Sequence, residues 1–272
     1  AYAHYIHQNI NNQENGGIAD TDLFLSGNSN FDNRLNIPVN LNSSDSRFGY
    51  RRYYFSHQFR PFAAEKFPFK IRHTIFHQGN KYYYNQQSAE PYYFDEASDL
   101  IDYPLSSKKY SKNLSNTVSV LFDKENFKLD AGVRHQLIKL GIGAALPSSL
   151  NIPHEISENR IGAVGNLQIK LWDKIALNSN LEFSNGNEFG TFLRSQNLMK
   201  FEPVEGYFVN AKVNFQSASP TFNLLVNPSV YRQFNYYFDN PNNETITEIG
   251  GDINLKWFQS KVFANYFRID NY

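Results

Sequence analysis

The segment SRFGYRRYYFSHQFRPFAAEKFPFKIRHTIFHQGNKYYY, residues 46–84, decides the fold class. Apolar and polar residues alternate in two runs within it, 51–60 and 69–78. Side chains of a strand point alternately to the two faces of a sheet, so each run predicts a strand with one apolar and one polar face. We expect Phe59 to pair with Phe69, which places the apolar residues of both strands on the same side. The segment therefore predicts a two-faced β-hairpin.

The composition excludes several classes of protein. The 272 residues include 24 Phe and 18 Tyr but only one Met, and no apolar run is long enough for a transmembrane helix. The 26 basic and 26 acidic residues balance, so we expect no nucleic-acid partner. Because Cys is absent, disulfides and thiolate metal sites are excluded. The sequence begins at Ala1 without a signal peptide, and we expect an export signal either to have been removed or to lie outside this stretch.

The alternating pattern recurs along the chain, with short and long connections following one another. Helical periodicity is not convincing anywhere, and we expect about eleven strands in a single region, 1–272. Residues 184–205 are expected to form one of the long loops. The predicted strands are 1–10, 51–59, 69–78, 114–122, 127–137, 160–171, 175–183, 206–215, a less regular strand from Thr221, 248–257 and 262–269.

Short turns at one end and long loops at the other, with strands of about ten residues, are the layout of an outer-membrane barrel. We therefore predict an all-β fold, an antiparallel transmembrane β-barrel with short periplasmic turns and long extracellular loops. In a bilayer every backbone polar group must pair within the protein, so the sheet must close or have its edges covered. Bacterial single-chain barrels usually have an even number of strands. The odd number found here leads us to expect that these residues are part of a larger barrel.

In such a barrel the apolar face meets lipid and the polar face lines the lumen. Aromatic residues near the strand ends are typical of the two membrane interfaces. The candidates for this aromatic girdle are Tyr53, Phe59, Phe69, Phe122, Phe127, Trp172, Phe215 and Trp257. The candidates for the lumen are Arg52, Arg60, Lys70, Arg72, Lys128, Asp130, Arg134, Arg160, Lys170, Glu182, Lys212, Glu248, Asp252 and Lys256.

Basic residues outnumber acidic ones among the lumen candidates. Charges that line a pore set its ion preference, so we expect a mild preference for anions. A second interpretation stays open, in which many of these charges lie at strand ends or are neutralised by other strands.

The alternative fold is a soluble all-β sandwich or propeller, with the apolar faces packed together. His57 and His73 favour it, since they fall on the predicted lipid face and a charged imidazole is costly within a membrane. A neutral histidine near an interface meets this objection. The alternating loop lengths and the many polar residues on the second face favour the barrel.

Catalytic and metal-binding motifs do not stand out. His73 and His77 share a strand face, but strand residues four apart are separated by about 13 Å, so these two alone cannot hold one ion. Asp45, Ser46 and His77 could approach one another near a loop rim, a coincidence that is common in a chain rich in Ser and Asn. We expect no enzymatic activity, no cofactor and no bound metal.

Several segments resemble a known family. YIHQNINNQENGGI (5–18), IPVNL (37–41), RRYYFSHQF (51–59) and KYYYNQQ (81–87) are similar to the putative porin family of Bacteroidota, a family of large outer-membrane barrels. The resemblance covers about the first half of the chain. It implies an outer-membrane location in a Gram-negative bacterium and passive diffusion of small hydrophilic solutes, and it supplies no catalytic residues.

A second function stays open beside diffusion. The chain could be an outer-membrane scaffold or accessory barrel, or a client of a secretion or barrel-assembly machinery, without pore function. Its aromatic loop segments, 82–84 and 92–94, would then dock another outer-membrane protein. Outer-membrane lipid is the expected partner in both cases.

Overall fold

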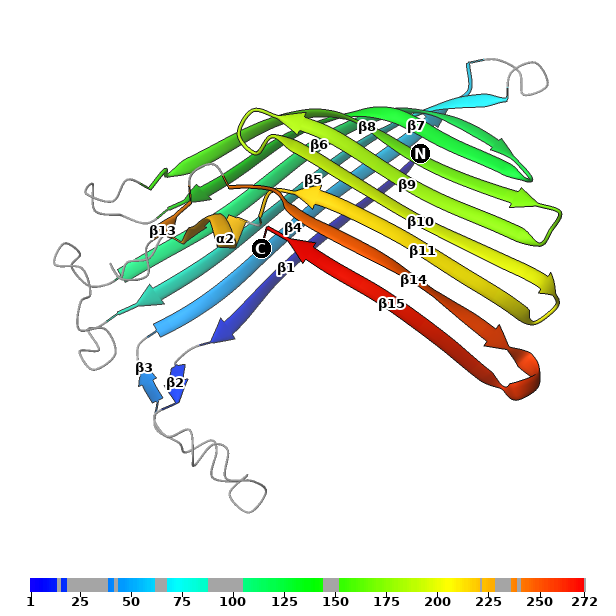
Figure 1. The fold of residues 1–272 in the computed structure, drawn as a ribbon. Coiled ribbons are helices and arrows are strands. Elements are labelled where there is room, and N and C mark those ends of the chain that lie inside the picture. Colours follow the sequence, from blue (N-terminus) through cyan, green and yellow to red (C-terminus); the bar gives the residue numbers. More distant parts are fainter. Residues whose placement is uncertain are drawn as a thin grey trace.

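The computed structural model describes residues 1–13, 16–18, 39–41, 44–61, 68–87, 105–143, 152–220, 222–227, 236–238 and 241–271. Its main feature is an antiparallel sheet of eleven strands, each of which lies beside the next one along the chain (Figure 1). The strands, in spatial order, are β1 (Tyr2–Gln13), β4 (Ser44–Phe59), β5 (Phe69–Gln86), β6 (Leu105–Lys124), β7 (Phe127–Ile142), β8 (Glu155–Leu171), β9 (Ile175–Gly186), β10 (Thr191–Val204), β11 (Tyr207–Ala218), β14 (Glu244–Leu255) and β15 (Ser260–Asp270).

The remaining elements are short. β2 (Gly16–Ile18) pairs with β3 (Val39–Leu41), and β12 (Val226–Asn227) pairs with β13 (Tyr236–Tyr237). The helices of the described residues are the single turns α2 (Phe222–Leu225) and η3 (Lys256–Phe258). In the part of the chain that the structure describes, no helix is long and apolar enough to cross a membrane.

Tight turns at one end of the sheet join β6 to β7, β8 to β9, β10 to β11 and β14 to β15. In the turn between β8 and β9, Trp172 and Asp173 have φ of 51° and 53°, and the backbone N–H of Lys174 donates to the carbonyl of Leu171 at 3.0 Å. Two successive residues of positive φ are the mark of a type I′ turn, whose twist matches that of the flanking strands. We call this end of the sheet the turn end and the opposite one the loop end.

One predicted loop and one predicted strand are wrong. Residues 184–205 were expected to be a loop, but they contain β10. The strand expected from Thr221 is replaced, within the described residues, by the helical turn α2 and the two-residue strand β12. The alternation in β10 is broken, because Ser195 and Asn197 lie on the otherwise apolar face.

The first hairpin has a different register from the one expected. Phe59 pairs with Ile71 rather than with Phe69. A shift by two residues preserves the face on which each side chain lies, so the apolar residues of β4 and β5 still share one side. Both strands of the next pair are longer than expected, since β5 runs to Gln86 and β6 begins at Leu105.

One face of the sheet carries an apolar band. Register places Val118, Val133, Ala163 and Phe183 side by side on it, and Val133 is 57% exposed. The band has the length that a tilted strand needs to cross the hydrocarbon of a bilayer. It runs over 114–122 of β6, 127–137 of β7, 161–171 of β8, 175–183 of β9 and 207–215 of β11. Toward the loop end it stops at outward polar residues, among them Lys112, Lys139, Asn159, Asn185 and Ser217.

Several polar side chains within the apolar band contact one another. The Ser179 hydroxyl donates to Asn197 Oδ1 at 2.6 Å. The Nε2 atom of His57 lies 3.1 Å from Nδ1 of His73. Because one ring nitrogen of such a pair must accept, at least one of the two imidazoles is neutral.

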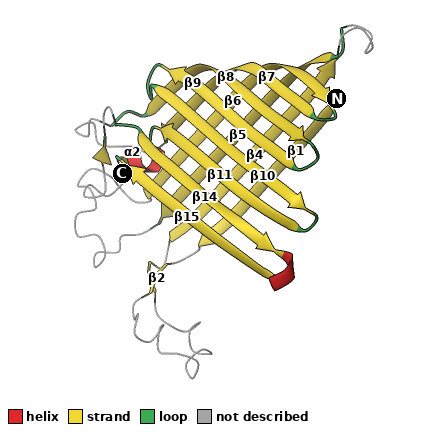
Figure 2. Cartoon of the chain, turned by 45° about the vertical axis from the view of Figure 1, so that its right-hand side comes forward, coloured by secondary structure: helices red, strands yellow, loops and turns green. Residues whose placement is uncertain are grey.

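The opposite face is concave. Figure 2 shows β11, β14 and β15 crossing in front of β1, β4 and β5, so the sheet curls round a hollow side. The segment after β11 crosses this side, and Val226, which is fully buried, packs against Ile142 of β7. Among the strands that the structure describes, the sheet is open along β1 and β15, each of which pairs with one neighbour only.

Candidate functional site

The concave face is polar from β5 to β14. Residues that pair across neighbouring strands form a row on this face, and in one such row Leu121 is the only apolar member. Across the strands the row consists of Lys70, Leu121, Asp130, Asn166, Asn180, Gln196, Asn214 and Glu248.

The centre of the concave face contains a cavity of about 660 Å³ that is rich in arginine. Its charged lining residues are Arg52 of β4, Arg72 of β5, Arg134 of β7, Glu182 of β9 and Arg194 of β10. We call this the arginine cavity. Four guanidinium groups face one carboxylate within it, so its charge is positive.

Glu182 holds two of these arginines. Arg194 Nη2 donates to Glu182 Oε2 at 2.8 Å, and Arg134 Nη1 is bonded to the other carboxylate oxygen. Arg134 Nε also donates to Thr117 Oγ1 at 3.2 Å. The Glu182 side chain is only 11% exposed, and a carboxylate this enclosed needs the ion pairs to offset its lost hydration. Two guanidinium groups around one carboxylate leave a net positive charge.

The other arginines of the cavity differ in their partners. Arg72 is paired with Asp130 of β7, across the intervening strand β6. The guanidinium of Arg52 lies 5.0 Å from the centre of the Phe76 ring and has no ion pair within the described residues. The Nε atoms of Arg52 and Arg194 make no hydrogen bond there either. The Arg52 guanidinium is therefore the cation of the arginine cavity that no carboxylate of the described residues neutralises.

The structure brings the strand-borne lumen candidates together on the concave face. They are Arg52, Lys70, Arg72, Lys128, Asp130, Arg134, Arg160, Lys170, Glu182, Lys212, Glu248 and Asp252. Arg60 follows the end of β4, and Lys256 begins η3, so these two lie outside the strands. That the set lines a lumen stays a prediction.

Sequence reasoning missed Arg194, a central member of the arginine cavity. It also missed Lys200, because both belong to the strand that was taken for a loop. The phase of Leu193, Met199 and Phe201 was the available signal, since these three share the apolar face.

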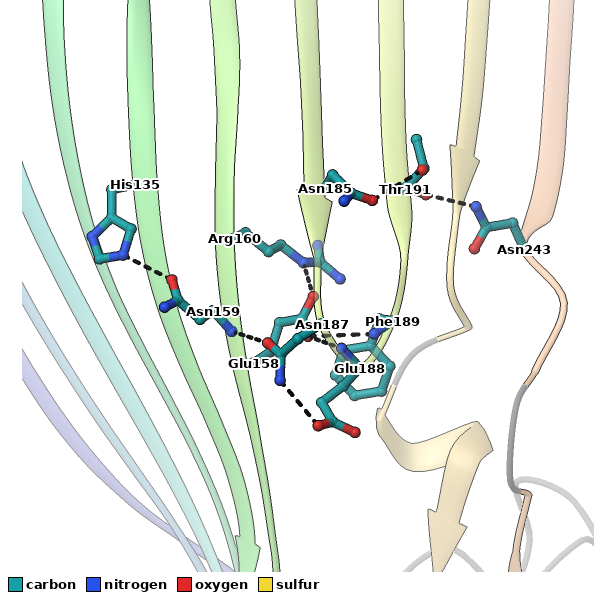
Figure 3. A network of polar contacts seen from close by, with 10 residues as sticks. All are labelled: His135, Glu158, Asn159, Arg160, Asn185, Asn187, Glu188, Phe189, Thr191 and Asn243. Carbon is teal, nitrogen blue, oxygen red and sulfur yellow. Dashed lines mark hydrogen bonds and ion pairs between the residues drawn. The ribbon is translucent and has the colours of Figure 1, made fainter.

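A second carboxylate fixes the rim at the loop end (Figure 3). Glu158 has a fully buried side chain and accepts from Arg160 Nε at 2.8 Å. It also accepts from the backbone N–H groups of Glu188 at 2.7 Å and Phe189 at 3.3 Å. The backbone N–H of Asn159 donates to Asn187 Oδ1 at 2.8 Å. The connection between β9 and β10 is therefore tied to β8.

The segment 222–227 narrows the concave side at the loop end. Val226 packs on Ile142, and Ile152 contacts the same pair. Lys109 lies on β6 between the loop end and the stretch that carries the apolar band. Its Nζ atom donates to Asn227 Oδ1 at 2.6 Å, and burial lowers the pKa of this amine.

The aromatic girdle candidates lie at the two borders of the apolar band. Tyr53 and Phe215 lie toward the loop end, and the others lie at the turn end. The rings of Phe69 and Phe122 are 5.1 Å apart, and Trp172 and Trp257 are 80% and 84% exposed. The turn-end set is Phe59, Phe69, Phe122, Phe127, Trp172 and Trp257.

The structure separates the residues that could have met at a loop rim. Asp45 pairs with Asn85, which is eight positions along β5 from His77, or about 26 Å at strand spacing. Ser46 lies on the opposite face from both. Within the described ranges, no three His, Asp or Glu side chains are grouped so as to hold a metal ion.

One of three comparisons with known proteins shows the family to which this chain is related. A family described as "Putative porin" matches residues 1–272. The translocator domain of the autotransporter NalP from Neisseria meningitidis is similar at a TM-score of 0.31 and 9% identity, over 84% of this chain and 75% of that chain. A comparison with curated proteins gives no match.

Proposed function

This chain belongs to the putative porin family, and from that premise we propose that it forms the wall of a pore for the passive diffusion of small hydrophilic solutes. The family and the antiparallel sheet indicate an outer-membrane β-barrel. The pore, its solutes and its ion preference are the proposed part.

The observation that carries the proposal is the contrast between the two faces of the same strands. The outer face is apolar over the length of a membrane crossing, whereas the concave face presents Arg, Lys, Asn and Gln from neighbouring strands. Closure of the sheet along β1 and β15 would turn the concave face into a water-filled lumen. Alternation of this kind, apolar outward and polar inward, is typical of porin strands.

The charge pattern supports a preference for anions. Asp130 and Glu248 are each paired with a cation, and Glu182 is paired with two. Arg52, Lys70 and Lys170 have no ion pair within the described residues, so positive charge is in excess. A low-dielectric wall that carries charge of one sign concentrates counter-ions in the opening between its sides.

The test is the reversal potential of the full-length protein in planar bilayers under a salt gradient. We expect steady conductance and a reversal potential on the anion side. The double variant Arg52→Gln, Lys70→Gln should move the reversal potential toward the cation side, because it removes two positive charges without breaking an ion pair. Lys124→Gln is the matched control, since Lys124 lies on the outer face beside Phe122. Cation preference in the unmodified protein would contradict the proposal.

One observation favours the second candidate function, a silent scaffold barrel. The segment 222–227 lies across the concave side, where Val226 is fully buried. A lumen closed in this way would not conduct. A folded protein without conductance that co-purifies with another outer-membrane protein at fixed stoichiometry would support the scaffold over the pore.

A further inference from the structure

Basic residues cluster on the outer face of β4 to β7, directly beyond the apolar band at the loop end. Register places Arg51, Gly79, Lys112 and Lys139 side by side in one row across these four strands. Lys81 follows Gly79 on the same face of β5. The cluster therefore lies where an outward-facing strand leaves the hydrocarbon.

Gly79 forms the floor of a gap between these cations. It has no side chain, and a Cβ atom at its position would meet only His77 Cε1 at 3.8 Å and Ser111 O at 3.9 Å. Arg51 and Lys112 flank the gap on the two neighbouring strands, about 10 Å apart at normal strand spacing. Lys81 lies beyond it, and the imidazole of His77 leans toward it from the apolar side. Long basic side chains can converge over such a gap.

The groups around the gap are available for a ligand. Arg51, Lys81 and Lys112 form no ion pair within the described residues. Lys112 is held 5.4 Å above the ring of Tyr110, whereas Lys139 is already paired with Glu155 at 2.9 Å.

The rest of the border toward the loop end has a different character. On β8 to β14 the first outward residues beyond the apolar band are neutral. They are Asn159, Asn185, Thr191, Ser217 and Thr247. The positive charge at this border is therefore confined to β4 to β7.

We propose that Arg51, Lys81 and Lys112 bind a phosphate group of an anionic lipid in the outer leaflet, over the gap at Gly79. Charge complementarity favours phosphate, and each cation near a membrane surface adds about 1 kcal/mol to the binding of an anionic lipid. The acyl chains then lie on the apolar band below, along Tyr53 and Leu114. The inference rests on the outer-membrane orientation, with the long loops outside, and does not require a conducting pore.

The test uses the full-length protein folded in neutral detergent and native mass spectrometry. The probes are lipid A, dephosphorylated lipid A and inorganic phosphate. We expect lipid A to remain bound and the other two not to. The triple variant Arg51→Gln, Lys81→Gln, Lys112→Gln should bind lipid A on the order of a hundredfold more weakly. Lys124→Gln, at the opposite border of the apolar band, should bind as the unmodified protein does.

Three results would overturn the proposal. Equal retention of dephosphorylated lipid A would show that phosphate is not recognised, and displacement by inorganic phosphate would show a site for small anions. Unchanged binding by the triple variant would place the lipid elsewhere. The heat-dependent shift in gel mobility that folded barrels show confirms that each variant is folded. Because the readout is binding, a protein that fails to conduct still tests this site.

Discussion

Replacing Glu182 with Gln tests the arginine cavity most sharply. The change keeps the shape of the side chain and removes the charge that holds Arg134 and Arg194. Removal of one partner from a buried ion pair costs about 3–5 kcal/mol. The two arginines are 28% and 38% exposed and face the concave side, so water screens part of their repulsion. We therefore expect Glu182→Gln to lower the free energy of unfolding by about 2 kcal/mol.

Urea-dependent unfolding in lipid vesicles measures this loss. Trp172 and Trp257, the two tryptophans of the chain, lie in turns at the same end of the sheet, so their fluorescence reports membrane insertion. Glu205→Gln, in the exposed turn between β10 and β11, is the matched control and should change stability by less than about 0.5 kcal/mol. In a double-mutant cycle, adding Arg194→Gln should restore part of the loss. If Glu182→Gln and Glu205→Gln unfold at the same urea concentration, the cavity contributes nothing to stability and the reasoning fails.

Three further changes give distinct outcomes. Gly141→Val places a Cβ atom against the Tyr110 ring, so the same unfolding assay should show a loss of about 1–3 kcal/mol, and an unchanged midpoint would contradict that close approach. Hydrogen bonds from Lys139, Tyr110 and Ser157 lower the pKa of the Glu155 carboxyl to about 2. A lowered folded-state pKa means that this stabilisation is present above about pH 4.5 and is lost as the pH falls toward 2, and carbon-13 NMR titration of Glu155 should show its pKa rising in Lys139→Gln. Val226→Asp should displace the segment 222–227 and raise single-channel conductance, whereas equal conductance would show that the segment does not restrict the pore.

The two faces of the sheet were predictable because they follow from local sequence alone. Strand side chains alternate with a period of two, so the phase of Arg72 or Asp130 is fixed whatever the exact register. Phe59 pairs with Ile71 instead of the expected Phe69, but it still lies on the expected face of the sheet. The strand β10 escaped detection because Ser195 and Asn197 interrupt its apolar phase.

The arginine cavity was not predictable in its detail. Glu182 and Arg134 lie on strands that are separated by β8, and their contact depends on the curvature of the sheet. Local patterning carries no information about curvature. The contact between Val226 and Ile142 was not predictable for a similar reason. The two residues are far apart in the chain, and the segment that carries Val226 has no strand periodicity.

The central claim is that the apolar face meets lipid and the polar face meets water. Because the chain has no Cys, single cysteines can be placed at Asn166, Leu167, Gln168 and Ile169 of β8, whose register alternates between the two faces. In vesicles, a membrane-impermeant thiol reagent should label positions 166 and 168, and a fluorophore at 167 or 169 should be quenched by spin-labelled lipid. Protection of 167 and 169 without quenching by spin-labelled lipid, the pattern of a soluble sheet whose apolar face is packed inside the protein, would contradict the account.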